Sequence, residues 1–305
     1  MTGLKRGCVL LAEHDPAWKT LAGEAENELR NLLGDCAADV RHVGSTAIDG
    51  IRAKPILDLA VALRCPPQET ELAKKLAPAG YLYRPQAAIG DELFFIRTAP
   101  GNPETVTHHI HVVAQGGMAW KNYVNFCDYL NSFPEKAREY EELKLRLAAL
   151  YPNDRNAYTA GKAEWIAYAL RKAMVWSYLG REIDMEVDRP IGYVHRKKLY
   201  TLVYPINYGY IPGVLGGDGE ELDVYLLGVD RPVERFHARV IGIVHRKNDV
   251  EDKLIAAPVG MSFTSAEMAK AIFFQEQHYD TFVEGVEERG KLFFRKVSPA
   301  SLHIL

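Results

Sequence analysis

The chain has 305 residues, 48% of them hydrophobic and 25% charged, with a formal net charge of −3. These values are typical of a globular protein long enough for two domains. The nearly balanced charge gives no basic footprint for bulk nucleic acid, and no apolar run approaches the roughly 20 residues that a membrane span needs.

The N-terminal segment and the cysteines indicate the compartment. The apolar stretch before Glu13 is too short for a secretory signal. The cysteines occur singly, without the spacing of a zinc site, as Cys8, Cys36, Cys65 and Cys127. We therefore expect reduced thiols in a cytoplasmic protein.

The first half of the chain alternates helices and strands. A helix is predicted from Asp15-Pro16 to Leu33, with proline near its first turn and Gly34 after its end. Strands are predicted at 40–43, 55–63, 82–83, 93–97 and 107–113, with a helix at 69–76 and a mostly helical region from 120 to about 178. This order predicts a mixed sheet followed by a helical cap.

Polar residues of the first half predict a nucleotide- or phosphate-binding site. The backbone N–H groups at Gly44-Ser45, directly after a predicted strand, can cradle a phosphate. Asp58 lies in a buried strand, and His109 and His111 alternate on another, so the three can meet around a metal or a phosphate. The predicted set is Gly44, Ser45, Arg52, Lys54, Asp58, His109 and His111, with Arg41 nearby. The alternative is that the histidines are hydrogen-bonded residues of a half-buried sheet.

These motifs resemble the GrpB family, within the nucleotidyltransferase superfamily. The resemblance rests on the segments at 42–47, 53–58, 109–113, 126–130 and 140–144, covers roughly residues 8 to 172, and implies a nucleotidyltransferase fold. Nucleotidyl transfer places two Mg²⁺ about 3.5–4 Å apart, between carboxylates that usually alternate on one strand face. Ala60 stands two residues after Asp58, so a second acid would have to come from Asp91 or Glu92 on another strand.

From Arg181 the pattern changes to short strands separated by turns. Strands are predicted at 183–187, 199–203, 222–227, 237–245, 253–257 and 292–297. The segment from Thr264 to Glu267 is a helix N-cap signature, and its helix is expected to reach about Tyr279. Several short strands with one helix predict a small, closed, OB-like β-barrel. The predicted fold is α+β in two domains, 1–174 and 175–305.

Two acidic segments of the second half predict a site for a hard cation. Carboxylates around a glycine turn can direct their oxygens to one point, which suits Mg²⁺, with Mn²⁺ as the alternative. Crowded carboxylates repel one another unless cations neutralise them. The predicted metal ligands are Asp218, Glu220, Asp223, Asp249, Glu251 and Asp252, and which of the last three faces the metal stays open. The alternative is that these segments are an acidic surface turn and a solvated hairpin.

The segment Tyr-Pro-Ile-Asn-Tyr-Gly-Tyr-Ile at 204–211, joined to the acidic turn, resembles the soluble, Mg²⁺-dependent inorganic pyrophosphatases. The resemblance covers about residues 180–297 and implies a β-barrel hydrolase, in which divalent ions neutralise pyrophosphate while basic and tyrosine side chains hold it. The residues that it implies for catalysis are Asp218, Asp223, Tyr208, Arg189, Lys253 and Tyr279. Glu220 replaces the middle aspartate of the family motif, and Asp280 stands where the family has a lysine, so the phosphate-binding side is changed. In the basic run at 195–198, Arg196 to Lys198 are assigned to phosphate only as a group.

We predict Mg²⁺-dependent hydrolysis of pyrophosphate by the second domain, in a homo-oligomer. If the first domain transfers a nucleotidyl group, the tethered hydrolase would consume the released pyrophosphate at high effective concentration. Two alternatives stay open: a nucleotidyltransferase with a regulatory barrel, and a protein that binds a phosphorylated ligand without catalysis. Ala60 and Asp280 favour the second alternative, whereas the retained acidic turn argues against it, because unused carboxylate clusters cost electrostatic repulsion.

Overall fold

The computed structural model describes residues 2–64, 69–88, 90–196, 201–216, 219–247, 249 and 251–286. The chain divides into two compact units, Met1–Leu170 and Arg171–Leu305. The division falls within helix α6 (Ala163–Trp176), a few residues before the boundary expected from the sequence. The strand predicted at 292–297 lies outside the described residues.

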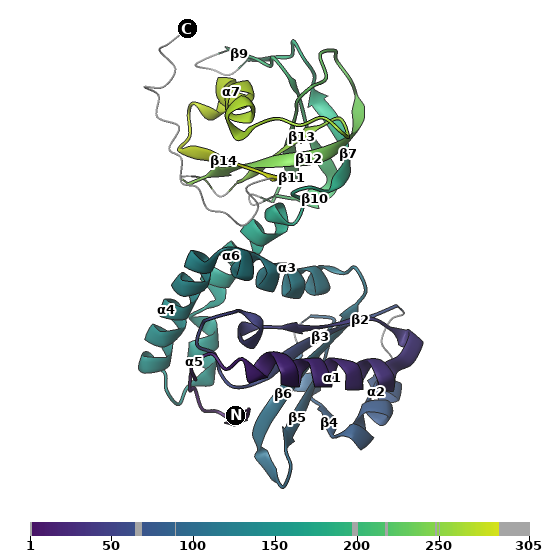
Figure 1. Ribbon diagram of the computed structural model, residues 1–305, viewed down its shortest axis with the longest axis vertical. Coiled ribbons are helices and arrows are strands. Elements are labelled where there is room, and N and C mark those ends of the chain that lie inside the picture. The colour runs from purple at the N-terminus through teal and green to yellow at the C-terminus, as the bar shows by residue number, and fades with distance from the viewer. Residues whose placement is uncertain are drawn as a thin grey trace. The chain divides into compact units, whose positions relative to one another are not determined.

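The N-terminal unit is built on a six-stranded mixed sheet (Figure 1). Its strands are β1 (Leu4–Lys5), β2 (Ala37–Val43), β3 (Leu57–Leu63), β4 (Tyr81–Tyr83), β5 (Leu93–Ala99) and β6 (Asn102–Ala114). The order is β2-β3-β6-β5-β4, with β1 also paired to β6. Strands β3 and β6 are parallel, and the other pairs are antiparallel, which confirms the predicted mixed sheet.

Helices cover both faces of this sheet (Figure 1). They are α1 (Ala17–Leu33), α2 (Glu69–Leu76), α3 (Met118–Ser132), α4 (Pro134–Leu150), α5 (Arg155–Ala160) and α6, with short 3-10 turns η1 (Gly34–Cys36), η2 (Ser45–Ala47), η3 (Ala77–Ala79) and η4 (Pro85–Ala87). Buried residues of α1 recur every three or four positions, as an amphipathic helix requires, and pack on Leu57, Leu59 and Val61. On the opposite face, Cys127 of α3 packs against Ala60. Because strand residues alternate, Asp58 shares this second face with Ala60.

The C-terminal unit is a closed five-stranded barrel. Its elements are β7 (Glu182–Arg189), β8 (Val194–Arg196), β9 (Thr201–Val203), β10 (Asn207–Leu215), β11 (Glu221–Leu226), β12 (Arg235–Arg246), β13 (Lys253–Ala257), α7 (Ser265–Glu276) and β14 (Thr281–Gly285). The pairing runs β13-β11-β10-β7-β12 and closes through β12–β13, while β14 adds to β12 and β8 pairs with β9. The predicted small closed barrel is therefore confirmed.

Strand β10 contains the tyrosine-rich segment, which the sequence did not predict as a strand. A Cβ atom on Gly209 would lie 1.8 Å from the backbone oxygen of Glu186, so only glycine permits this approach of β10 to β7. The pairing register shifts at the same point, between Tyr208 and Gly209. The glycine that reads as a turn in the sequence is therefore the residue that lets two barrel strands cross.

Helix α7 begins with a capping box, as its sequence predicts. The Thr264 side chain accepts a hydrogen bond from the Glu267 N–H, and the Glu267 carboxylate accepts one from the Thr264 N–H. The helix ends at Glu276, before the Tyr279 expected from the sequence, and buries Met268 and Ile272 in the barrel core.

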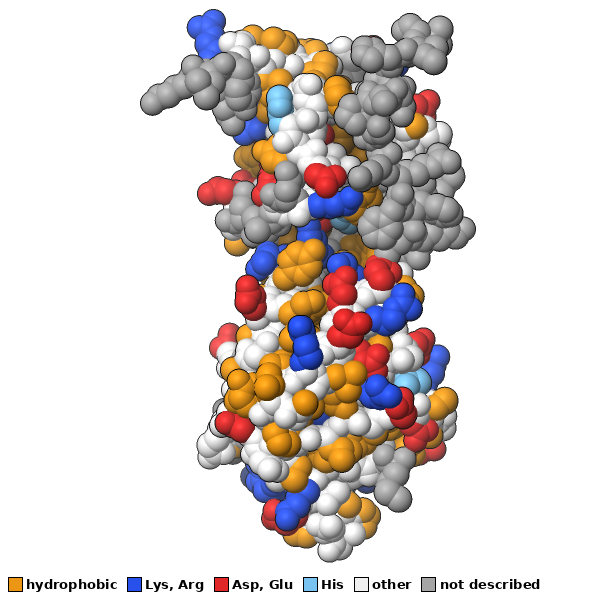
Figure 2. Space-filling view, turned by 90° about the vertical axis from the view of Figure 1, so that its left-hand side faces the viewer, with side chains coloured by type: hydrophobic (Ala, Val, Ile, Leu, Met, Phe, Trp, Pro, Cys, Tyr) orange, Lys and Arg blue, Asp and Glu red, His pale blue; other side chains and the backbone are white. Residues whose placement is uncertain are grey.

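Charges of both signs are spread over the surface. Figure 2 shows Lys and Arg side chains interspersed with Asp and Glu among the described residues of the face in view, in keeping with the net charge of −3. No helix in the described part of the chain is long and apolar enough to span a bilayer. The described cysteines, Cys8, Cys36 and Cys127, are free thiols.

Candidate functional site

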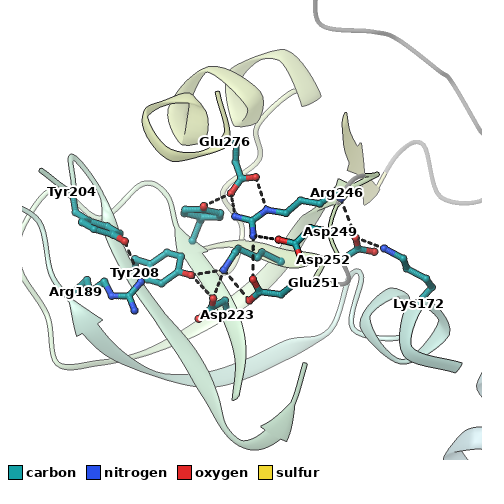
Figure 3. Close-up of polar contacts among 12 residues, drawn as sticks. Lys172, Arg189, Tyr204, Tyr208, Asp223, Arg246, Asp249, Glu251, Asp252 and Glu276 are labelled. Atoms are coloured by element: carbon teal, nitrogen blue, oxygen red, sulfur yellow. Dashed lines mark hydrogen bonds and ion pairs between the residues drawn. The ribbon is translucent and has the colours of Figure 1, made fainter. Parts of the chain in front are cut away.

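A polar cluster in the barrel brings Tyr208, Asp223, Glu251 and Lys253 together from three strand segments (Figure 3). The Lys253 ammonium group donates to Asp223, to the Tyr208 hydroxyl at 2.7 Å and to Glu251 at 2.8 Å. The Tyr208 hydroxyl also donates to Asp223. Two carboxylates and a phenol thus converge on one positive charge.

Burial and mutual contact set the protonation of these carboxylates. Burial opposes ionisation of Asp223, but the neighbouring Lys253 ammonium group lowers its pKa below the usual value. Burial and the contact with Asp223 raise the pKa of Glu251. Lys253 therefore offsets part of the repulsion between the two acids, and Glu251 keeps its proton to a higher pH than an ordinary glutamate.

Arg246 forms ion pairs with a second group of carboxylates beside this cluster, and it was not among the residues predicted from the sequence. Its guanidinium group donates to Glu276 at 2.7 and 2.9 Å, and to Asp249 and Glu251 at 3.1 Å each (Figure 3). Its charged end also stacks on the Tyr279 ring, 3.7 Å from the centroid. The sequence signal that could have found it is an arginine at the end of a buried strand, directly before an acidic run.

Asp252 does not join the predicted metal ligands. Its carboxylate accepts from Lys172 at 2.6 Å and contacts His245 at 2.9 Å, and its side chain is 1% exposed. The reason is the alternation of side chains along an extended segment, which sends Glu251 and Asp252 to opposite sides. The sequence left open which of Asp249, Glu251 and Asp252 faces a metal, and the Asp252 carboxylate contacts Lys172 and His245.

Of the remaining predicted barrel residues, Arg189 lies beside the cluster. The Arg189 guanidinium group donates to the Tyr204 hydroxyl at 3.1 Å and stacks 4.9 Å from the Tyr208 ring centroid. Asp280 lies 3.7 Å from the Lys247 ammonium group. Glu220 is exposed in the turn before β11, and Asp218 lies outside the described residues, as do Lys197 and Lys198 of the basic run.

Asn207 of the tyrosine-rich segment has a structural role. It is fully buried, its amide donates to the backbone oxygens of Val229 and Arg231, and its own side-chain oxygen accepts from the Ile191 N–H. The side chain therefore joins three separate segments of the barrel. Tyr210 donates to Glu186 across the neighbouring strands at 3.1 Å.

The cluster fits a hard cation at one point. Asp223 and Glu251 offer oxygen ligands of the kind that Mg²⁺ prefers, and they already hold a positive charge there. Asp249 and Asp252 are engaged by Arg246 and Lys172, respectively. Across the described ranges, which exclude Asp218, no group of three or more candidate ligands is arranged around a common point. The described residues therefore provide fewer metal ligands at one point than the sequence predicted.

A second polar site lies in the N-terminal unit, in a cavity of about 270 Å³ against the α3 face of the sheet. The cavity contains six of the seven residues predicted there: Gly44, Ser45, Lys54, Asp58, His109 and His111. The parallel register pairs Asp58 with His109 and Ala60 with His111, which brings the two histidines beside the aspartate. Alternation on neighbouring strands is the reason that sequence patterns could locate this group.

Hydrogen bonds join these residues to a second acid. His109 contacts Asp58 at 2.8 Å, and His111 contacts Glu92 at 3.2 Å and lies 3.8 Å from Asp58. Burial opposes the charge on Asp58, but hydrogen bonds from both histidines lower its pKa far below the usual value. Although burial opposes it, the two carboxylates raise the pKa of His111 to about 9. His111 therefore lies between the two acids that nucleotidyl transfer would need for metals.

Arg52 is the predicted residue that the structure places elsewhere. Its guanidinium group pairs with Glu13, at 2.8 Å from Nε, and does not line the cavity. Arg41 pairs with Asp128 at 3.2 Å in a different pocket. Asp91 is exposed, whereas Glu92 is 5% exposed and also accepts from the Tyr123 hydroxyl at 2.7 Å.

The helical cap supplies cavity residues that the sequence analysis missed. They are Tyr123, Phe126, Tyr140, Arg155, Tyr158, Thr159 and Lys162. Phe126 and Tyr140 begin two of the segments that carry the GrpB resemblance, but no motif marks the other five positions. The seven residues come from three helices and the turn before α6, so their convergence is a tertiary feature. The residues Tyr-Pro-Asn-Asp at 151–154 interrupt the helical pattern and are the local signal that a new, short helix follows.

Each unit is similar to a known protein family. The chain belongs to the GrpB family, whose family model (GrpB protein) matches residues 8–172, and the inorganic pyrophosphatase family model matches residues 178–296. The glutamate-rich protein GrpB of Alkalihalophilus pseudofirmus is 35% identical over 167 residues, which cover 54% of this chain and 96% of that protein. Of two further curated relatives, from Pseudomonas aeruginosa and Bacillus subtilis, the chain spans 65% and 46%.

Solved structures match each unit in turn. The crystal structure of the conserved protein GrpB from Enterococcus faecalis is 25% identical, with a TM-score of 0.51, and the match covers 55% of this chain and 99% of that chain. An inorganic pyrophosphatase from Neisseria gonorrhoeae is 24% identical, with a TM-score of 0.28, over 37% of this chain and 87% of that chain.

Proposed function

We propose that the C-terminal unit hydrolyses inorganic pyrophosphate to two phosphates with Mg²⁺. The observation that carries this proposal is the convergence of Asp223 and Glu251 on the Lys253 ammonium group beside the Tyr208 hydroxyl. This group lies within the segment that matches the inorganic pyrophosphatase family. An anionic substrate and its cation need such a mixture of basic, phenolic and carboxylate groups.

The charge of each residue in the cluster would determine its role. Lys253, Arg189 and Tyr208 are the donors for phosphate oxygens, because they are cationic or phenolic and surround the acids. Asp223 and Glu251 would hold Mg²⁺, with Asp218 as the further carboxylate expected from the sequence. When bound, Mg²⁺ supplies positive charge against the phosphate oxygens. Arg246 orients Glu251 through its 3.1 Å contact.

A cation among these acids would release Lys253 for the substrate. Its ammonium group now balances Asp223 and Glu251, which leaves less of its charge for a phosphate. A divalent ion would take over this neutralisation and free the ammonium group to donate outwards. We therefore propose that Mg²⁺ promotes substrate binding as well as turnover, in a homo-oligomeric cytoplasmic protein.

Phosphate release from pyrophosphate at neutral pH, with and without Mg²⁺, tests the proposal. Asp223→Asn keeps the shape of the side chain but removes its charge, and we expect a loss of about 100-fold or more in turnover. Asp230→Asn is the matched control, because Asp230 is an exposed residue of the same barrel. Absence of metal-dependent turnover in the wild type, or equal turnover in both variants, would reject the proposal.

A further inference from the structure

Part of the cavity of the N-terminal unit is lined by cationic side chains that form no ion pair with its acids. Lys54, Arg155 and Lys162 line it together, and none of the three has an ion pair among the described residues. Burial, then repulsion from Lys162 and Arg155, lowers the pKa of Lys54 to about 8. Like charges gathered in a partly buried place are unfavourable unless an anion joins them.

Tyr158 provides a second, independent sign of a ligand. Its side chain is fully buried in the cavity wall, yet its hydroxyl has no hydrogen-bond partner. A buried hydroxyl without a partner is unfavourable, and a hydrogen bond with a ligand oxygen would remove this cost. The Lys54 and Lys162 ammonium groups lie 5.3 and 4.7 Å from the centroid of the same ring. The two ammonium groups therefore lie over the ring that carries this hydroxyl.

We propose that this cavity binds a small phosphate anion through Lys54, Arg155, Lys162 and the Tyr158 hydroxyl. Phosphate is the expected class because its several oxygens can accept from all four donors at once. The volume of about 270 Å³ lies below the roughly 300–1,000 Å³ of pockets for drug-sized ligands, which favours pyrophosphate or a sugar phosphate over a whole nucleotide. In a sugar phosphate, hydroxyl groups would face Asp58 and His109 at the other end.

Binding to the full chain tests this inference. Isothermal titration calorimetry with inorganic pyrophosphate and with ribose 5-phosphate would be done in the Asp223→Asn background, so that turnover does not interfere. We expect Lys162→Gln to weaken binding at least about tenfold, since it removes a charge-assisted contact. Lys121→Gln, at an exposed position of α3, is the matched control and should bind like the parent.

Tyr158→Phe separates a ligand contact from a structural role. The ring stays, and the hydroxyl has no partner to lose, so the urea midpoint should stay the same or rise while binding weakens severalfold. Where Lys162→Gln weakens the binding, tighter binding of ribose 5-phosphate than of pyrophosphate would identify the ligand as a phosphate monoester. Tighter binding of pyrophosphate than of ribose 5-phosphate would identify it as an inorganic anion. If neither anion binds, or if Lys162→Gln and Tyr158→Phe bind both like the parent, the inference is overturned. Neither outcome depends on hydrolysis by the barrel.

Discussion

Gly44 shows, at the scale of a single residue, how closely the walls of the N-terminal cavity approach each other. Its φ of +70° suits glycine, and a Cβ atom there would lie 2.4 Å from the Asp58 carboxylate. We predict that Gly44→Ala lowers the free energy of unfolding by more than the roughly 1–2 kcal/mol of a left-handed alanine, because Asp58 must move as well.

Gly50→Ala is the control for this prediction. Gly50 has nearly the same φ, +75°, but nothing within 4 Å of the added Cβ atom. Urea denaturation of both variants therefore separates the backbone strain from the collision with Asp58. Equal losses of stability in the two variants would contradict the prediction.

Single residues also show why some members of the sites could be predicted from the sequence and others could not. Asp58, His109 and His111 could be grouped from the sequence, because strand alternation and a shared face are local patterns. Arg155 and Lys162 could not, since they reach the cavity from helices whose packing no local pattern fixes. Which of Asp249, Glu251 and Asp252 faces a metal could not be decided either, because the sequence does not show that Arg246 is buried and contacts Asp249 at 3.1 Å.

At the scale of secondary structure elements, His245 of β12 connects β14 with the segment before β13. Its ring contacts Asp252 at 2.9 Å and Glu284 at 3.0 Å. Burial opposes the imidazolium form, but the Asp252 charge and these hydrogen bonds raise the pKa of His245 to about 9. The charged His245 ring therefore links β12 to β14 and to the segment before β13.

The stability of the barrel should fall as pH rises through this range. The folded pKa of about 9 lies above the ordinary histidine value of about 6.5. The stabilisation is thus fully present below about pH 6.5 and lost as pH approaches 9, a change of roughly 2–3 kcal/mol in the free energy of unfolding. Urea midpoints at pH 6.5 and 9 should show a smaller pH dependence for His245→Gln than for the wild type.

His237→Gln is the matched control for this pH dependence. His237 lies on the same strand, but it is exposed, and solvent screens its contacts with Glu182 and Asp184. This variant should keep the wild-type pH dependence. A His245→Gln protein that loses stability with pH as steeply as the wild type would show that another group is responsible.

Most element types were predictable from the sequence, but strands β10 and β14 of the C-terminal unit were not. The helix before Gly34, the buried strand around Asp58 and the capping box of α7 follow local rules, and the structure confirms them. Strand β10 was missed because Gly209 and Pro212 read as turn residues, although Gly209 is needed for the close crossing of β7. Strand β14 was missed because a short edge strand of five residues carries little pattern.

At the scale of the whole molecule, the two polar sites belong to separate units. The barrel cluster lies in Arg171–Leu305, and the phosphate cavity proposed above lies in Met1–Leu170. The sequence suggested that the first unit releases pyrophosphate for the second. The described geometry favours binding in the first unit, because His111 occupies the space between the acids that nucleotidyl transfer would need.

Separate sites predict that the two functions can be removed one at a time. Asp223→Asn should abolish pyrophosphate hydrolysis and leave ribose 5-phosphate binding intact, since Asp223 and the cavity belong to separate units. Lys162→Gln should do the reverse, and the double variant should show both losses with additive logarithms, as expected for independent sites. Hydrolysis and calorimetry on the same four proteins measure this. A fall in hydrolysis caused by Lys162→Gln alone would instead show that the N-terminal cavity controls the barrel.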